Sequence, residues 1–269
     1  MAKAWLILSG KGGVGKTLIT ASLAAALSSR KERVCAVDAV TGMRDLDMML
    51  GLENRIVYDM LDVIRGDCTM DEALVSPPDL PRLSLLPAAQ FARSGEVEAK
   101  AFARLVRKLK SRFDHVLIDC PAGLEDNLRA LVSDEITDCI VVATPDDMCI
   151  RSAERAVAAL ADCGVTYPHM LVNRLDASLI VSGEMYTAST VAQTLDLPLL
   201  GEIPEDALLR RAVLGHKNPM QIDCEGRHAL CRIAQRMLGE DVPLPAIGGT
   251  KPGLFRRPHL KPLKEVRAD

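Results

Sequence analysis

A glycine-rich segment near the N-terminus contains the residues whose chemistry is clearest from the sequence. Residues 10–17 match the pattern G-x-x-x-x-G-K-[ST] and read Gly-Lys-Gly-Gly-Val-Gly-Lys-Thr. In this pattern the glycines let successive backbone N–H groups point at phosphate oxygens, the lysine reaches the β- and γ-phosphates, and the hydroxyl binds Mg²⁺. The segment predicts a site for a nucleoside triphosphate, with Lys16 and Thr17 in these two roles. A chance match is the alternative.

The elements that must position this loop alternate along the chain. Near-continuous apolar runs predict strands buried on both faces of a parallel sheet, at residues 4–9, 34–38, 83–86, 115–119, 139–144, 170–173 and 199–203. Helical patterns lie between or after them, at 16–29, 57–64, 97–111, 151–162, 189–195, 207–215 and 227–238. This order predicts an α/β fold with one doubly wound, mostly parallel sheet. The loop then stands after a strand and opens a helix, which argues against a chance match.

Composition excludes several other classes. Of the 269 residues 48% are hydrophobic and 26% are charged, and the net charge is −3, so neither disorder nor a strongly basic nucleic-acid binder is indicated. We therefore expect no nucleic-acid partner. No apolar run approaches the length of about 20 residues that a membrane helix needs, and we expect a cytoplasmic protein.

The eight cysteines are scattered and form no C-x-x-C pair. Reduced, structural thiols in a reducing compartment are the favoured interpretation, since several of them lie in apolar runs. Cys224 and Cys231 could share a helix face, but no further ligand completes a metal site there.

The last residues differ in character from the rest. Residues 242–269 are rich in proline and glycine, so we predict a domain over residues 1–241 and a tail over 242–269. From Lys251 onward the tail has six basic and two acidic residues, a local charge of +4. Its apolar residues Leu254, Phe255, Leu260 and Leu263 could touch a membrane, whereas Pro258 and Pro262 interrupt any helix. A tail without a role is the alternative.

The sequence resembles the MinD group of the ParA/MinD family of ATPases with a deviant Walker A motif. The resemblance rests on the lysine at position 11, on the stretch from Gly42 to Asp59, and on the segments 86–90, 119–123, 172–174 and 203–206. It covers about residues 1–240. It implies ATP and Mg²⁺ as cofactors, a homodimer in the ATP state, and a role in selecting the division septum site. It also implies a MinC-like division inhibitor and a topological-specificity factor as partners, and reversible, peripheral association with the inner face of the cell membrane.

The resemblance also implies roles for single residues. The phosphates would be held by Lys11, Gly12, Gly13, Val14, Gly15, Lys16, Thr17 and Leu18, with Lys11 reaching across the dimer to the partner's phosphates. Lys11, Lys16 and Asp38 would serve catalysis, and Thr17, Asp38 and Asp119 would hold Mg²⁺, Asp119 through water. The adenine would be bracketed by Asn173, Arg174, Pro204, Glu205 and Asp206. Arg151, at the head of its helix, would face the dimer partner, or would simply be a solvated arginine.

Two residues depart from the family pattern. Val40 stands where a second aspartate usually helps to orient the attacking water, and valine cannot accept a hydrogen bond. Leu18 replaces a threonine that contacts the α-phosphate, which should lower nucleotide affinity modestly. We therefore expect a slow ATPase.

Three other functions remain in competition with that of a MinD-like switch. Val40 favours a nucleotide-binding scaffold that hydrolyses ATP poorly. A ParA-like partition ATPase would need a basic surface patch. An iron–sulfur carrier on this fold would need paired cysteines.

Overall fold

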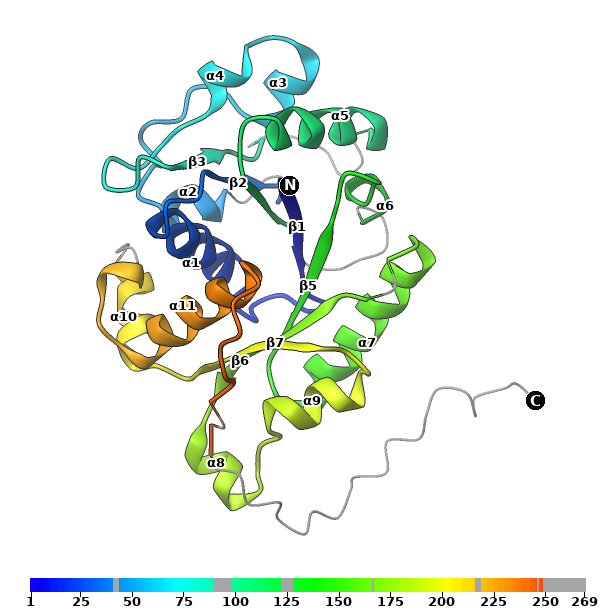
Figure 1. The fold of residues 1–269 in the computed structure, drawn as a ribbon, viewed down its shortest axis with the longest axis vertical. Helices are drawn as coiled ribbons and strands as arrows, with labels where there is room; N and C mark the ends of the chain where they lie inside the picture. Colours follow the sequence, from blue (N-terminus) through cyan, green and yellow to red (C-terminus); the bar gives the residue numbers. More distant parts are fainter. Residues whose placement is uncertain are drawn as a thin grey trace, which may run out of the picture.

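The protein was analysed as a computed structural model that describes residues 1–40, 44–89, 98–121, 128–165, 167–215, 219–245 and 247–248. Its centre is a sheet of seven strands in the order β3-β2-β4-β1-β5-β6-β7, and every paired strand is parallel to its neighbour (Figure 1). The strands are β1 (Lys3–Leu8), β2 (Val34–Asp38), β3 (Leu83–Leu86), β4 (His115–Asp119), β5 (Asp138–Ala143), β6 (His169–Leu175) and β7 (Leu199–Pro204). The predicted α/β fold is confirmed.

Helices cover both faces of the sheet. The longer ones are α1 (Lys16–Ser29), α5 (Ala99–Lys110), α7 (Asp147–Asp162), α10 (Ala207–Leu214) and α11 (Glu225–Met237). The shorter ones are α2 (Asp45–Met49), α3 (Met60–Arg65), α4 (Met70–Ala73), α6 (Leu128–Leu131), α8 (Ala177–Ser182), α9 (Ala188–Thr194) and the 3₁₀ helix η1 (Pro219–Gln221). One face packs against α3 and α5 to α9, the other mainly against α1, α2, α10 and α11.

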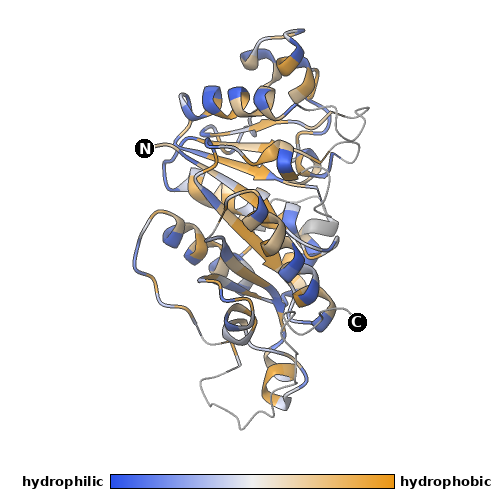
Figure 2. Ribbon diagram, turned by 90° about the vertical axis from the view of Figure 1, so that its right-hand side faces the viewer, coloured by the Kyte–Doolittle hydropathy of each residue, from blue (hydrophilic) through white to orange (hydrophobic). Residues whose placement is uncertain are grey.

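Each strand contributes side chains to both cores, which explains the continuous apolar runs. In β1, Leu6 and Leu8 belong to one core while Trp5 and Ile7 belong to the other. Figure 2 shows the hydrophobic strands enclosed between helices whose outer sides are hydrophilic. A sheet buried in this way has its free backbone and side-chain groups only at the strand ends, where a ligand can reach them.

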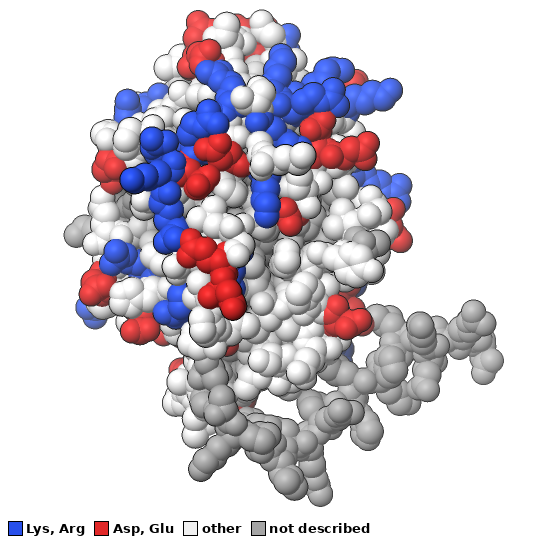
Figure 3. Space-filling view, in the orientation of Figure 1, with Lys and Arg blue, Asp and Glu red and all other residues white. Residues whose placement is uncertain are grey.

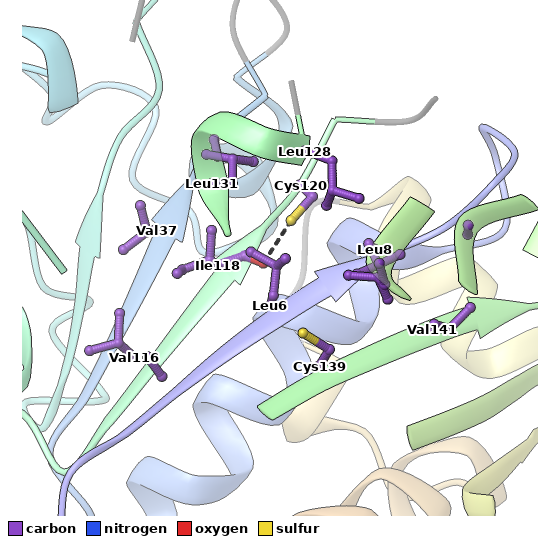
Figure 4. Close-up of a cluster of buried hydrophobic side chains, with 14 of the residues drawn as sticks. Leu6, Leu8, Val37, Val116, Ile118, Cys120, Leu128, Leu131, Cys139 and Val141 are labelled. Atoms are coloured by element: carbon purple, nitrogen blue, oxygen red, sulfur yellow. Dashed lines mark hydrogen bonds between the residues drawn. The ribbon is translucent and has the colours of Figure 1, made fainter. Parts of the chain in front are cut away.

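The cysteines take part in this packing. Cys120 and Cys139 are buried in the core that α6 covers, beside Leu6 and Ile118 (Figure 4), and all eight thiols are free. Burial raises the pKa of the Cys139 thiol to about 12, and it raises that of Cys120 as well. These thiols are therefore protonated, structural groups.

Several predicted boundaries were wrong, for reasons that lie in the caps. The helix expected from residue 57 begins at Met60, because the Asp59 carboxylate accepts hydrogen bonds from the backbone N–H groups of Leu61 and Asp62. The helix expected from Arg151 begins at Asp147, because Asp146 caps it by accepting from Cys149 N. Arg151 therefore lies in the second turn of α7 and not at its head.

The first residues after the predicted domain boundary contact the domain. The Arg236 guanidinium of α11 donates to the carbonyl oxygens of Val242 (2.8 Å), Pro243 (2.6 Å) and Leu200 (3.1 Å). Farther along, Ile247 N donates to the buried carboxylate of Glu202 at 3.3 Å. Val242, Pro243 and Ile247 are thus held beside β7, an outer strand of the sheet. The rest of the predicted tail, 249–269, lies outside the described residues.

Candidate nucleotide-binding site

The glycine-rich loop connects β1 to α1 at the carboxyl end of the central strand. Gly13 (φ 79°) and Gly15 (φ 94°) adopt the left-handed conformation that favours glycine, and Gly15 is the N-cap of α1. Lys11, Gly12 and Gly13 are exposed, whereas Val14 and Lys16 are buried. Residues 11–13 are thus exposed beside the positive end of the α1 dipole, where the sequence predicts a phosphate site.

Asp119 is the centre of the polar contacts below the loop. Its buried carboxylate accepts from Lys16 Nζ at 2.7 Å on one oxygen and from Thr17 Oγ1 at 2.6 Å on the other. Thr20 Oγ1 adds a longer contact of 3.3 Å and also donates to the Lys16 carbonyl at 3.0 Å. The structure thus brings together Lys16, Thr17 and Asp119 as expected. Sequence reasoning missed Thr20; its signal was a hydroxyl residue one turn after Lys16, on the same side of the helix.

Asp38 lies next to Asp119, because these two residues pair in the register of β2 and β4. Its two carboxylate oxygens accept from the backbone N–H groups of Val40 (2.9 Å) and Leu46 (3.4 Å). Burial raises the pKa of Asp38 to about 7, the Val40 N–H opposes this shift, and the negative charge of Asp119 adds to it. Unlike Asp119, Asp38 forms no hydrogen bond or ion pair with a cation among the described residues, so its ionised form is favoured by the two backbone N–H groups and by the charge of Lys16, which does not contact it.

The two departures from the family pattern lie beside these groups. Val40 is half-buried two residues after the end of β2, and its backbone N–H donates to Asp38. Leu18 is half-buried and packs against the core on the α1 side of the sheet. Neither side chain can accept or donate a hydrogen bond.

The residues expected to bracket the adenine lie at the ends of β6 and β7, and Leu175 pairs with Pro204 there. Asn173 is buried, and its amide donates to the Val14 carbonyl at 2.8 Å, so it contacts the loop itself. Arg174 and Glu205 are exposed, and Glu205 forms an ion pair with Arg210. The Asp206 carboxylate accepts from Leu208 N, Leu209 N and Gly226 N, which identifies it as the cap of α10.

Two cations remain exposed near the loop. The Lys11 ammonium and the Arg151 guanidinium have no hydrogen-bond or ion-pair partner among the residues described. The loop and α7 are nevertheless in direct contact, because a Cβ added to Gly10 would lie 1.9 Å from the Ser152 carbonyl oxygen. The structure therefore places α7 beside the loop.

The donor set at this site fits Mg²⁺. A threonine hydroxyl and a carboxylate, with a second carboxylate on the adjacent strand, are the oxygen ligands that this ion prefers. Among the described residues no group of three or more His, Cys, Asp or Glu side chains could hold a metal by itself.

A phosphate loop between a central parallel strand and a helix, with a lysine, a threonine and an aspartate beneath it, defines a P-loop NTPase. The family model described as "ParA: NUBPL iron-transfer P-loop NTPase" matches residues 1–237. The septum site-determining protein MinD of Bacillus subtilis is 38% identical over 263 residues, covering 96% of this chain and 97% of that protein. The chain belongs to the MinD group of the ParA family.

Solved structures agree with this assignment. The structure of the MinC:MinD cell division protein complex from Aquifex aeolicus contains a chain that superposes with a TM-score of 0.84 at 32% identity, covering 92% of this chain and all of that chain (100%). MinD from Pyrococcus horikoshii, solved as a complex with Mg-ADP, gives a TM-score of 0.76 at 27% identity and covers 88% of this chain and 96% of that chain.

Proposed function

We propose that this chain is a switch that binds MgATP, dimerises in that state and hydrolyses ATP to return to the monomer. The observation that carries the proposal is Lys11. It is exposed on the phosphate loop and forms no hydrogen bond or ion pair with the described residues, although its charge acts on Asp146. In the ParA/MinD family a lysine at this place reaches the phosphates of the partner subunit, and an unpartnered cation at the loop is what such a role requires.

The remaining loop residues have roles within one subunit. Lys16 moves from Asp119 to the triphosphate, a charge-assisted contact that a short shift of its flexible side chain allows. Thr17 and Asp119, which are hydrogen-bonded to each other, become available to Mg²⁺, with Asp119 acting through water and Asp38 in support. The bound ion neutralises phosphate charge and orients the β- and γ-phosphates.

The partners we propose follow from the family. A MinD chain in complex with MinC is among the similar structures, which supports a MinC-like division inhibitor as a partner. A topological-specificity factor is proposed by resemblance alone. No helix among the described residues is long and apolar enough to span a bilayer. We assign reversible contact with the inner face of the cell membrane to the basic tail after residue 250.

The test is the oligomeric state measured by light scattering. We expect the native chain to be a monomer with MgADP and a dimer with MgATP. Lys11→Ala should bind ATP and remain a monomer, while Lys100→Ala, which removes an exposed lysine of α5, should dimerise normally. An ATP-bound dimer of unchanged mass in the Lys11 variant would contradict the proposal.

Val40 favours a second candidate, a dimerising scaffold that hydrolyses ATP barely or not at all. Each Asp38 oxygen already accepts one backbone N–H, from Val40 or from Leu46, so the orientation of this carboxylate is fixed for those bonds and not for an attacking water. A turnover assay separates the two functions: a scaffold stays dimeric in MgATP without releasing phosphate.

A further inference from the structure

The strand β6 is irregular at the point where it passes the phosphate loop. Val172 pairs with Glu202 and Leu175 pairs with Pro204, so β6 contains one more residue than β7 over this interval. Arg174 has a φ of 62°, which is uncommon for a residue other than glycine. Bulges and left-handed residues of this kind re-aim side chains and gather at functional sites.

The side chain at this bulge that faces the loop is Asn173. It is 5% exposed, and its Nδ2 donates to the Val14 carbonyl oxygen at 2.8 Å. A carbonyl oxygen can only accept, so the amide nitrogen and not Oδ1 must face it. The orientation of the amide is thus determined by its neighbour.

The same amide also limits the space around Gly15. A Cβ on Gly15 would lie 2.6 Å from Asn173 Nδ2, and the φ of +94° at Gly15 already disfavours a side chain. Asn173 therefore contacts the Val14 carbonyl oxygen and lies beside Gly15, immediately before α1 begins.

This peptide unit has a defined geometry. It is planar and trans, so the Val14 carbonyl and the Gly15 N–H point in opposite directions. When Asn173 holds the carbonyl on its own side, the N–H is directed away from Asn173. The same bond keeps the negative carbonyl oxygen from turning toward a bound anion.

We infer that Asn173 is a positioning residue for the phosphate loop: it orients the Val14–Gly15 peptide so that affinity for the phosphates themselves depends on it. The inference rests on the proposed binding of MgATP at this loop. A residue that contacts only the adenine would not affect a ligand without a base. Loss of the Asn173 amide, in contrast, should weaken the binding of such a ligand.

The experiment compares Mg-tripolyphosphate, which lacks the nucleoside, with MgATP, using displacement of a fluorescent ATP analogue from the full-length protein. Asn173→Ala should lower the affinity for both ligands by roughly three- to tenfold, as expected for one lost buried hydrogen bond. Gln193→Ala, which removes an exposed amide side chain of α9, is the matched variant, and it should leave the tripolyphosphate affinity unchanged. Thermal unfolding of both variants checks that the fold is intact.

A second measurement needs no ligand. Backbone amide hydrogen exchange in the nucleotide-free protein should be faster at residues 13–17 in Asn173→Ala, and unchanged in β4 and α5. Native tripolyphosphate affinity together with native exchange in this variant would overturn the inference. Failure of the native chain to bind MgATP would instead refute the proposed function, and the exchange measurement would still decide the role of Asn173.

Discussion

At the scale of single residues, the neighbouring carboxylates of Asp119 and Asp38 differ in the groups that compensate their negative charge. Asp119 has the ammonium of Lys16 at 2.7 Å, so its charge is compensated within the site. Asp38 has only the N–H groups of Val40 and Leu46. Because charge repulsion and burial act on Asp38 without a contacting cation, it is the carboxylate whose protonation can change near neutral pH.

Val40→Asp should raise the rate of ATP hydrolysis. The new carboxylate supplies an acceptor for the attacking water, and such positioned groups contribute about 10²–10⁴-fold. Single-turnover hydrolysis measures the effect, with Val57→Asp as the control because Val57 is an exposed valine remote from the phosphate loop in sequence. Equal rates for the native chain and Val40→Asp would show that position 40 does not limit the chemistry.

Asp38→Asn should change the pH dependence of stability. The folded pKa of about 7 lies above the ordinary value of 3.8, so the folded state binds more protons between these values and native stability falls as the pH rises through 7. Asparagine does not titrate, so the Tm of the native chain should decline relative to that of the variant between pH 5 and pH 8, without nucleotide or Mg²⁺.

The matched control for this prediction is Asp114→Asn. The side-chain hydrogen bond from Arg33 is the largest cause that holds the pKa of Asp114 at about 2, so Asp114 stays ionised over the whole range. The difference in Tm between Asp114→Asn and the native chain should therefore not change between pH 5 and pH 8. If the difference in Tm between Asp38→Asn and the native chain is also independent of pH, the raised pKa of Asp38 is refuted.

At the scale of elements, three strands and the first helix were the most predictable parts. The bounds of β2, β3, β4 and α1 agree with the prediction, because buried parallel strands have continuous apolar runs and the glycine pattern marks where α1 begins. The helices α2, α4, α6 and α8 were not predicted, because four to six residues are too few to show a helical period. In α4 the capping box of Thr69 and Glu72 was the available signal.

The candidate site, too, could be predicted only where a local sequence pattern marks it. The ligands on the loop follow from a local motif, so they were predictable from the sequence. The contact between Asn173 and Val14 joins residues 159 positions apart and depends on a bulge, which no local pattern in this chain indicates.

Gly10→Ala should separate the phosphate loop from α7. The added methyl group would meet the backbone of Ser152, which cannot move as a side chain could, so we expect a loss of about 1–3 kcal/mol in the free energy of unfolding and weaker nucleotide binding. Denaturant unfolding and ATP titration measure both. Ser152→Ala keeps the backbone oxygen and should behave like the native chain; native stability in Gly10→Ala would contradict the close packing.

At the scale of the whole molecule, charge is mixed over the domain and concentrated at the end of the chain. On the face shown in Figure 3, basic side chains lie among acidic ones. From residue 251 onward six of the charged residues are basic and two are acidic. A negative surface would therefore attract the tail more strongly than it attracts a domain of mixed charge.

Deletion of residues 251–269 should abolish most of the ATP-dependent pelleting with anionic liposomes. Each basic residue near such a surface contributes about 1 kcal/mol, and this contribution falls as salt screens it. Neutral liposomes and high salt are the controls, and both should reduce pelleting of the native chain. Unchanged pelleting of the truncated chain would place the membrane contact elsewhere.

The hydrogen bonds from Arg236 to the carbonyls of Val242 and Pro243 have a consequence for how such a tail would act. They fix the point where the tail begins, beside β7. The 21 residues from 249 to 269 have a maximum reach of about 70 Å. In the ATP-bound dimer that we propose, the folded domains would set the distance between the points where the two tails begin. Once one tail is attached, the other searches only the volume within its reach, so its effective concentration at the membrane is high. A dimer with two tails would then stay on the membrane, whereas a monomer with one tail would bind only briefly. Hydrolysis would release the protein simply because it dissociates the dimer.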